Sequence, residues 1–152
     1  MRIALDTSIL VRAYSSPGGP AARLLSVLCA RKHVIVTSEY IVEELRRVLS
    51  YPRIRARSGM DAAFIDGRLA ELWNSAAVAE PEVEYPVILA DPKDDPVLYT
   101  AVAGKADVLC TLDRHFFTPD VLAFCAERGI RVMKDVDLLR ELLGGEAEAH
   151  SA

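Results

Sequence analysis

Short runs of β-branched and aliphatic residues alternate with longer amphipathic segments along the chain, and this alternation limits the possible folds more than any other feature. The apolar runs predict strands at residues 2–5, 34–36, 76–79, 106–111 and 130–133. The remaining periodic segments predict helices at 7–14, around 24–28, and at 38–49, 60–75, 95–104, 119–128 and 135–143. Strands that alternate with helices imply an α/β protein whose parallel sheet is covered on both faces.

The length of 152 residues suits one domain with a sizeable core, and no linker divides the chain. We expect a single domain over residues 1–143 and a disordered tail at 144–152, which carries no core residue. No apolar run approaches the roughly 18 residues of a membrane span, and Asp6 comes too early for a signal peptide. Cys29, Cys110 and Cys125 lack metal-site spacing, so we expect buried thiols in a cytoplasmic protein.

The net charge of −4 does not by itself indicate nucleic-acid binding, but the basic residues are unevenly distributed. Five arginines fall within one short stretch: Arg46, Arg47, Arg53, Arg55 and Arg57. An arginine-rich edge beside an acidic centre suits a polyanionic substrate bridged by metal. The alternative is a solvated helix end, where cations are favoured by the helix dipole.

Four carboxylates stand where a strand end or a helix would direct them inward. They are Asp6, Glu44, Asp95 and Asp113. In open parallel sheets, ligands bind beyond the carboxyl ends of the strands at a topological switch point. Asp6 follows the first predicted strand and Asp113 the fourth, so these two meet if the two strands are neighbours. Acids gathered in a pocket repel one another and are costly to desolvate, so they usually hold a divalent cation.

Helical phase separates Glu44 from its neighbour Glu43. The apolar residues of the segment, Ile41 and Val48 among them, define one face at helical spacing. At about 100° per residue, Glu43 points away from this face and Glu44 borders it. We therefore prefer Glu44 as the inward-facing acid.

The other three acids also have structural explanations. Asp6 could cap the helix that follows it, and Asp113 could be a turn residue. Asp95 precedes Pro96, which suits the first helical position, so Asp95 would be an N-cap. The cluster of Asp91, Asp94 and Asp95 exceeds what one cap requires, and we expect an accessory role for Asp94.

Two hydroxyl groups, those of Ser8 and Thr111, could support the acids by hydrogen bonding. The histidines, His33, His115 and His150, are scattered along the chain, so we do not expect an imidazole-based zinc site. There is no Walker loop, dinucleotide-binding glycine fingerprint or nucleophile elbow.

Taken together, these residues resemble the PIN-domain family of metal-dependent ribonucleases over residues 2 to about 133. The matching pieces are LDTS at 5–8, the segment 38–49 with Glu44 and Leu45, DPKDDPVL at 91–98 with Ala101, and GKADVLCTLD at 104–113. Each piece is short, but their order and spacing make the set specific. The chain is most similar to the branch that contains toxins of bacterial and archaeal toxin–antitoxin pairs.

The resemblance implies an α/β/α sandwich, Rossmann-like, with a central, mainly parallel sheet. It also implies that the four acids bind Mg²⁺ or Mn²⁺, supported by Ser8 and Thr111. Some members carry a further acid after the fourth, where this chain has Phe116 and Phe117. Family members often form homodimers and are inhibited by a small antitoxin.

The sequence thus predicts an endoribonuclease that hydrolyses RNA phosphodiester bonds with one or two Mg²⁺ ions. Glu44 would bind metal or orient the attacking water, and the arginines would position the RNA backbone. One alternative is phosphoryl transfer by an aspartate nucleophile, but Ser8 stands where the partner acid is expected. The other is a catalytically weak adaptor that binds RNA or protein.

Overall fold

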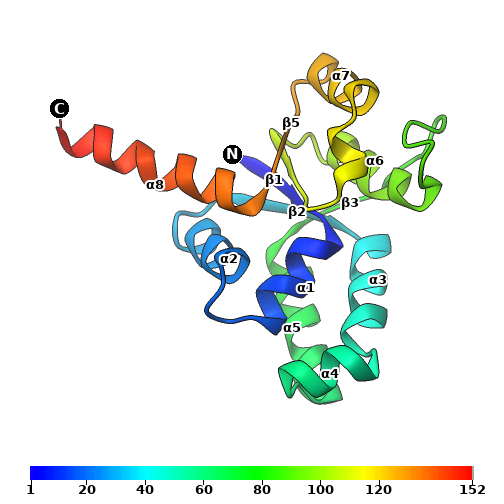
Figure 1. Cartoon of the computed structure of the whole chain (residues 1–152), viewed down its shortest axis with the longest axis vertical. Helices are drawn as coiled ribbons and strands as arrows, with labels where there is room; N and C mark the ends of the chain where they lie inside the picture. The colour runs from blue at the N-terminus through cyan, green and yellow to red at the C-terminus, as the bar shows by residue number, and fades with distance from the viewer. Residues whose placement is uncertain (152) are drawn as a thin grey trace.

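Five parallel strands form the centre of the protein, as the alternating sequence pattern predicted (Figure 1). The computed structural model describes the backbone of residues 1–151 and the side chains of residues 1–144. The strands are β1 (Arg2–Leu5), β2 (Val34–Ser38), β3 (Ala77–Ala79), β4 (Val108–Cys110) and β5 (Arg131–Met133). Their order is β3-β2-β1-β4-β5, and each neighbouring pair is parallel. Because β1 and β4 are neighbours, the condition for Asp6 and Asp113 to approach each other is met.

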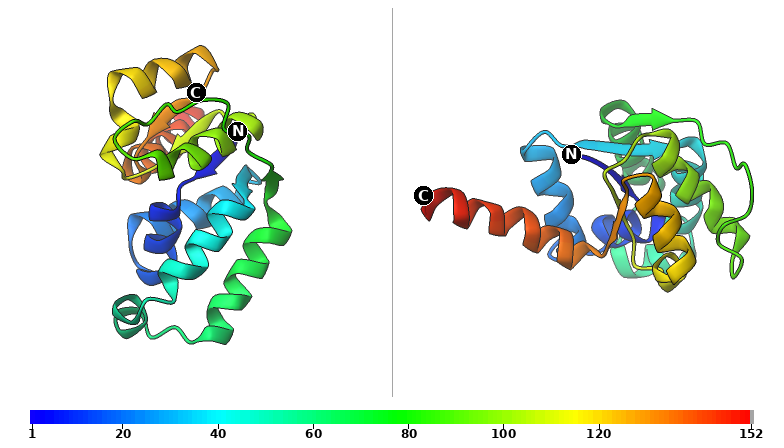
Figure 2. Two further views of the ribbon diagram at one scale, coloured as in Figure 1. Left: turned by 90° about the vertical axis from the view of Figure 1, so that its right-hand side faces the viewer. Right: turned by 90° about the horizontal axis from the view of Figure 1, so that it is seen from above.

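Helices cover both faces of this sheet, which confirms the three-layer α/β/α architecture. The helices are α1 (Thr7–Ser15), α2 (Pro20–Ala30), α3 (Glu39–Leu49), α4 (Pro52–Ser58), α5 (Ala62–Ser75), α6 (Asp95–Ala103), α7 (Pro119–Glu127) and α8 (Asp135–Ser151), with short 3-10 turns η1 (Pro92–Asp94) and η2 (Arg114–Phe117). Helices α6 and α7 lie on one face, and α1, α2, α3 and α5 lie on the other (Figure 2). Helix α8 packs against α2.

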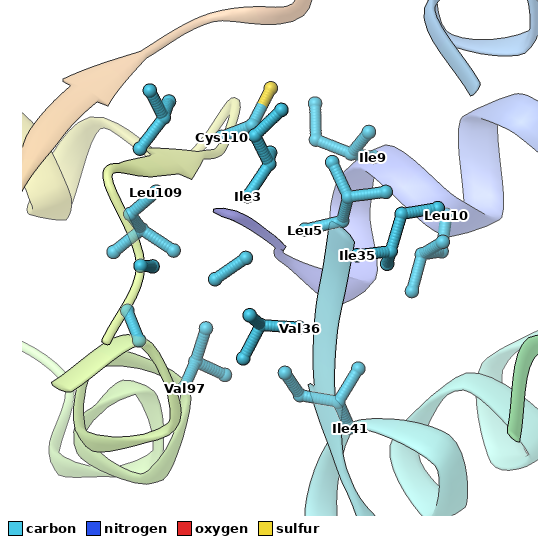
Figure 3. Close-up of a cluster of buried hydrophobic side chains, with 14 of the residues drawn as sticks. Ile3, Leu5, Ile9, Leu10, Ile35, Val36, Ile41, Val97, Leu109 and Cys110 are labelled. Carbon is cyan, nitrogen blue, oxygen red and sulfur yellow. The ribbon is translucent and has the colours of Figure 1, made fainter. Parts of the chain in front are cut away.

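The register of the central strands divides the core between the two faces. Ile3 pairs with Ile35 and Ala4 with Val36, and paired residues of parallel strands face the same side. Figure 3 shows Ile35 on the side of α1, whereas Val36 points towards α6. Both strands are buried on both faces, which explains why they read as apolar runs rather than as alternating patterns.

Two predictions about individual elements differ from the structure. Helix α4 was not predicted; Pro52, which follows α3 closely, occupies the first turn of this additional helix. The last helix continues beyond 143, to Ser151. The side chains of 145–152, most of the tail predicted as disordered, lie outside the described residues, so that prediction remains open.

Two sequence predictions concern the burial of the cysteine thiols and the presence of membrane-spanning helices. Cys110 and Cys125 are buried free thiols, but Cys29 is exposed, so the prediction of burial is wrong for Cys29. Its position on α2 faces away from the core residues Leu24 and Leu28 of the same helix. Within the described part of the chain, no helix is both long and apolar enough to cross a bilayer.

Candidate metal centre

Asp6 lies at the carboxyl end of β1, where its backbone N–H donates to Cys110 O at 3.0 Å and so continues the pairing with β4. Its side chain is only 6% exposed. Asp6 Oδ2 accepts hydrogen bonds from Thr111 Oγ1 at 2.7 Å and from Ser8 Oγ at 3.1 Å. Burial raises the pKa of Asp6 above its ordinary value, against these hydrogen bonds, and the charge of Glu44 adds to the rise. Asp6 is the N-cap residue of α1 but makes no side-chain capping bond, so capping does not explain its carboxylate.

Glu44 reaches the same region from the middle of α3. Thr7 Oγ1 donates to Glu44 Oε2 at 2.7 Å, which joins α3 to the start of α1. Glu43 is exposed, as the helical phase predicted. Thr7 was not among the predicted supporting residues, although its position directly after Asp6 was an available signal. The charge of Glu44 contributes to the raised pKa of Asp6, so the two carboxylates interact electrostatically.

Asp94 lies in surroundings that are unfavourable to negative charge. Its pKa is raised to about 8, first by burial, then by Asp113, and further by Asp91 and Asp6. Asp94 Oδ2 is buried and has no hydrogen-bond partner among the described atoms. Although Asp94 is the N-cap residue of α6, its side chain makes no capping bond. The structure therefore places Asp94 among the other acids.

Asp95 is directed elsewhere, contrary to the geometry predicted for it. Its side chain is 3% exposed, and Oδ1 accepts hydrogen bonds from Val87 N and Ile88 N, both at 3.0 Å. Asp95 is also the first residue of α6 rather than its N-cap. Successive residues at the start of a helix point in directions about 100° apart. Only one of the two neighbouring aspartates can thus face the strand ends, and that one is Asp94.

Asp113 and His115 lie together in the turn that follows β4. Asp113 Oδ1 accepts a hydrogen bond from His115 N at 2.9 Å, and Asp113 N donates to Thr111 Oγ1 at 3.0 Å. His115 Nδ1 is 3.4 Å from Asp113 Oδ1 and 3.8 Å from Asp94 Oδ2. Possible ligand atoms of Asp91, Asp94 and His115 all lie within 4.8 Å of one another.

His115 and Asp91 were not expected at the site. The three histidines are scattered in the sequence, but the fold brings His115 to the acids from the turn after β4. Asp91 approaches from the turn before α6, where its side chain also accepts a hydrogen bond from Lys93 N at 3.2 Å. Only the spacing of Asp91 before Asp94, and of His115 after Asp113, could have indicated these neighbours from sequence.

The five arginines predicted to bind substrate are divided between α3 and α4. Arg47 Nη2 is 3.8 Å from Glu44 Oε1. Arg46 instead pairs with Asp66 on α5. Helix α4 lies at the opposite end of α3 from the strand ends (Figure 1). It carries three exposed arginines: Arg53, Arg55 and Arg57.

The chain is similar to known proteins in sequence pattern and in fold. A family described as "PIN domain" matches residues 2–115. A search among curated proteins finds no match. Among solved structures, the chain is similar to one in the crystal structure of VapBC2 from Rickettsia felis bound to a DNA fragment from their promoter. The two are 17% identical with a TM-score of 0.58, and the alignment covers 88% of this chain and 98% of that chain. At this identity, the structural likeness is one of fold.

Proposed function

The chain belongs to the PIN-domain family, and on that premise we propose that it is a metal-dependent endoribonuclease. The region matched by the family contains the four acids that converge here: Asp6, Glu44, Asp94 and Asp113. The observation that carries the proposal is the gathering of these carboxylates at the strand ends, which together with burial raises the pKa of Asp94 to about 8. Carboxylates that oppose one another's ionisation in a half-buried site are stabilised by a bound cation.

The residues fit a divalent cation such as Mg²⁺ or Mn²⁺. Hard cations prefer carboxylate oxygens, and Asp94 Oδ2 is a buried oxygen with no protein hydrogen bond among the described atoms. Asp6, Asp94 and Asp113 would hold the ion, with Asp94 in the position predicted for Asp95. When bound, such an ion lowers the pKa of a coordinated water and offsets charge on the scissile phosphate.

Three hydroxyl groups hold the acids in place before any substrate binds. Those of Ser8 and Thr111 fix the orientation of the Asp6 carboxylate. The hydroxyl of Thr7 fixes Glu44, which would complete the ligand set or orient the water that attacks phosphorus. Ligands held by hydrogen bonds of this kind lose little freedom on binding, which favours affinity and correct geometry.

The arginines support RNA as the substrate. Arg47 lies beside Glu44, and Arg53, Arg55 and Arg57 are exposed on α4. Guanidinium groups bind phosphate groups through paired hydrogen bonds. Such contacts supply much of a protein's affinity for nucleic acid and do not depend on the base sequence. We propose that an RNA backbone runs from the acids along α3 towards α4.

Cleavage of a labelled single-stranded RNA in Mg²⁺ and in Mn²⁺ tests the activity. Asp6→Asn and Glu44→Gln should each lower kcat/KM at least about 100-fold, because each removes a charge that acts on the reacting groups. Glu43→Gln, on the exposed side of the same helix, is the matched control and should retain activity.

Two results would contradict this function. Full activity in Asp6→Asn would show that the acids do not carry the reaction, and full activity in EDTA would show that no metal is needed. If the wild-type protein binds Mn²⁺ and RNA but cleaves none of a broad set of RNAs, the adaptor function is favoured instead.

We also propose that the protein acts as the cytoplasmic toxin of a toxin–antitoxin pair. The support is the fold shared with a chain of VapBC2. Expression of the wild-type chain should arrest growth, Asp6→Asn should not, and co-expression of a small protein encoded beside it should relieve the arrest. The homodimer that the resemblance implies is tested by light scattering of the purified protein, with and without that antitoxin.

A further inference from the structure

Two buried polar atoms lie close together at the edge of the acidic site without hydrogen-bond partners among the described atoms. They are His115 Nδ1 and Asp94 Oδ2, 3.8 Å apart; His115 Nδ1 is also 3.4 Å from Asp113 Oδ1, a close contact that is not a hydrogen bond. A buried polar atom with no partner costs free energy, and in folded proteins a bound water molecule or ion is one explanation for such an atom. The separation of His115 Nδ1 and Asp94 Oδ2 is too long for a hydrogen bond between them. An ion or a water molecule bound between the two atoms would give each of them a partner.

Asp91 lies close enough to offer a further ligand atom at this position. Its carboxylate, that of Asp94 and the imidazole of His115 offer atoms that all lie within 4.8 Å of one another. Ligands bonded to one ion at about 2.0–2.2 Å lie about 3–4 Å apart. Modest movement of these side chains would therefore bring all three atoms onto a single ion.

The backbone around these three side chains is well anchored. Asp91 is the N-cap residue of the turn η1 and accepts a hydrogen bond from Lys93 N. His115 lies in η2, where its N–H is held by Asp113 Oδ1 and the adjacent Phe116 is fully buried. The site is thus built on two short turns that the core and the capping bonds fix, one on each side of α6 in the sequence.

We propose that Asp91, Asp94 and His115 form a mixed nitrogen and oxygen site that binds a transition-metal dication such as Mn²⁺ in preference to Mg²⁺. The inference rests on the proposed function only in that Asp94 is shared between the two ligand sets. An imidazole nitrogen is a good ligand for transition metals, whereas Mg²⁺ prefers oxygen and retains its waters. The single nitrogen donor therefore increases the difference in affinity between transition metals and Mg²⁺, which four carboxylates alone would bind more similarly.

Pulsed electron paramagnetic resonance of the full chain loaded with Mn²⁺ detects a coordinated nitrogen directly. The wild-type spectrum should show ¹⁴N modulation from an imidazole, and His115→Gln should lose it. The Kd for Mn²⁺ should rise at least about tenfold in His115→Gln, while the Kd for Mg²⁺ changes by less than about twofold. His33→Gln is the matched control and should retain the modulation, because His33 Nδ1 contacts the N-terminus instead.

Asp91→Asn provides a second variant that leaves the histidine in place. It should weaken Mn²⁺ binding to a similar extent, and circular dichroism should show that both variants are folded. Bound Mn²⁺ without ¹⁴N modulation would overturn this inference and leave the proposed nuclease function intact. Unchanged Mn²⁺ affinity in both folded variants would also overturn it, as would the absence of Mn²⁺ binding. Cleavage in Mg²⁺ tests the nuclease separately.

Discussion

Asp94 and Asp95 are adjacent carboxylates in opposite surroundings. Asp94 lies among other acids, and its pKa is raised to about 8. The carboxylate of Asp95 instead receives two backbone N–H groups, from Val87 and Ile88, and so holds the loop that leads into α6. Asp95 thus fixes the backbone from which Asp94 projects.

Replacing Asp95 with alanine should destabilise the protein. The substitution leaves the N–H groups of Val87 and Ile88 without their acceptor, and each unsatisfied buried donor costs about 1–3 kcal/mol. We expect the free energy of unfolding to fall by about 2–4 kcal/mol in a urea titration. Asp94→Ala is the matched control, with a loss below about 1 kcal/mol. Equal losses in the two variants would contradict this division of roles.

The raised pKa of Asp94 predicts how stability depends on pH in metal-free protein. Between about pH 4 and pH 8, the folded protein keeps a proton on Asp94 that the unfolded chain releases at its usual value near 3.8. The free energy of unfolding should therefore fall as pH rises through this window. Asp94→Asn should flatten the slope in urea titrations at several pH values with EDTA present. A slope equal to that of the wild type would show that Asp94 titrates normally.

Helix α3 shows how one element selects between two neighbouring acids. Its buried residues, Ile41, Leu45 and Leu49, lie on one face, and Glu44 borders that face while Glu43 does not. This arrangement was predictable from periodicity, because the 3.6-residue repeat fixes directions within a helix. The partner of Glu44 was not predictable in the same way, because Thr7 belongs to another element.

Helix α6 approaches the sheet closely at Gly104, and this approach predicts a clear effect of substitution. A Cβ atom at Gly104 would lie 2.2 Å from Val36 Cγ1 of β2 and 3.1 Å from Thr100 O. Gly104→Ala should lower the free energy of unfolding by about 1–3 kcal/mol, because the helix must move off the sheet.

Gly67 in α5 is the matched control, since nothing lies within 4 Å of a Cβ placed there. Gly67→Ala should raise the free energy of unfolding by about 0.5–1 kcal/mol, as expected for alanine in a helix interior. Thermal unfolding of the two variants should thus shift in opposite directions. A shift in the same direction would show that α6 is not in close contact with the sheet.

The strand order explains why acids from distant parts of the chain share one edge of the molecule. Strands β2 and β3 lie on one side of β1, and strands β4 and β5 lie on the other. The carboxyl ends of β1 and β4 therefore form the topological switch point. Asp6 and Asp113 follow those strands, while Asp94 arrives from the turn before α6. Their assembly depends on the whole sheet, so occupation of the site should be linked to global stability.

Removing the metal should therefore lower the melting temperature. A ligand that binds only the folded state at 100 times its Kd adds about 2.7 kcal/mol, which for a chain of this size is about 5–10 °C. The wild type in Mn²⁺ should lose this increment on addition of EDTA, and Asp94→Asn should show little shift. Asp137→Asn, an exposed acid on α8, should keep the full shift. An equal shift in all three proteins would indicate nonspecific binding.

The amino-acid pattern alone predicts the parallel sheet, the acids Asp6 and Asp113 that follow its strands, and the inward direction of Glu44. These features depend on local patterns, because periodicity and strand ends are properties of consecutive residues. The folded chain is needed to show that Asp94, and not Asp95, lies among the acids, and that His115 and Asp91 lie beside them. Those outcomes depend on turn geometry and strand order, which set distances between residues that local periodicity does not relate.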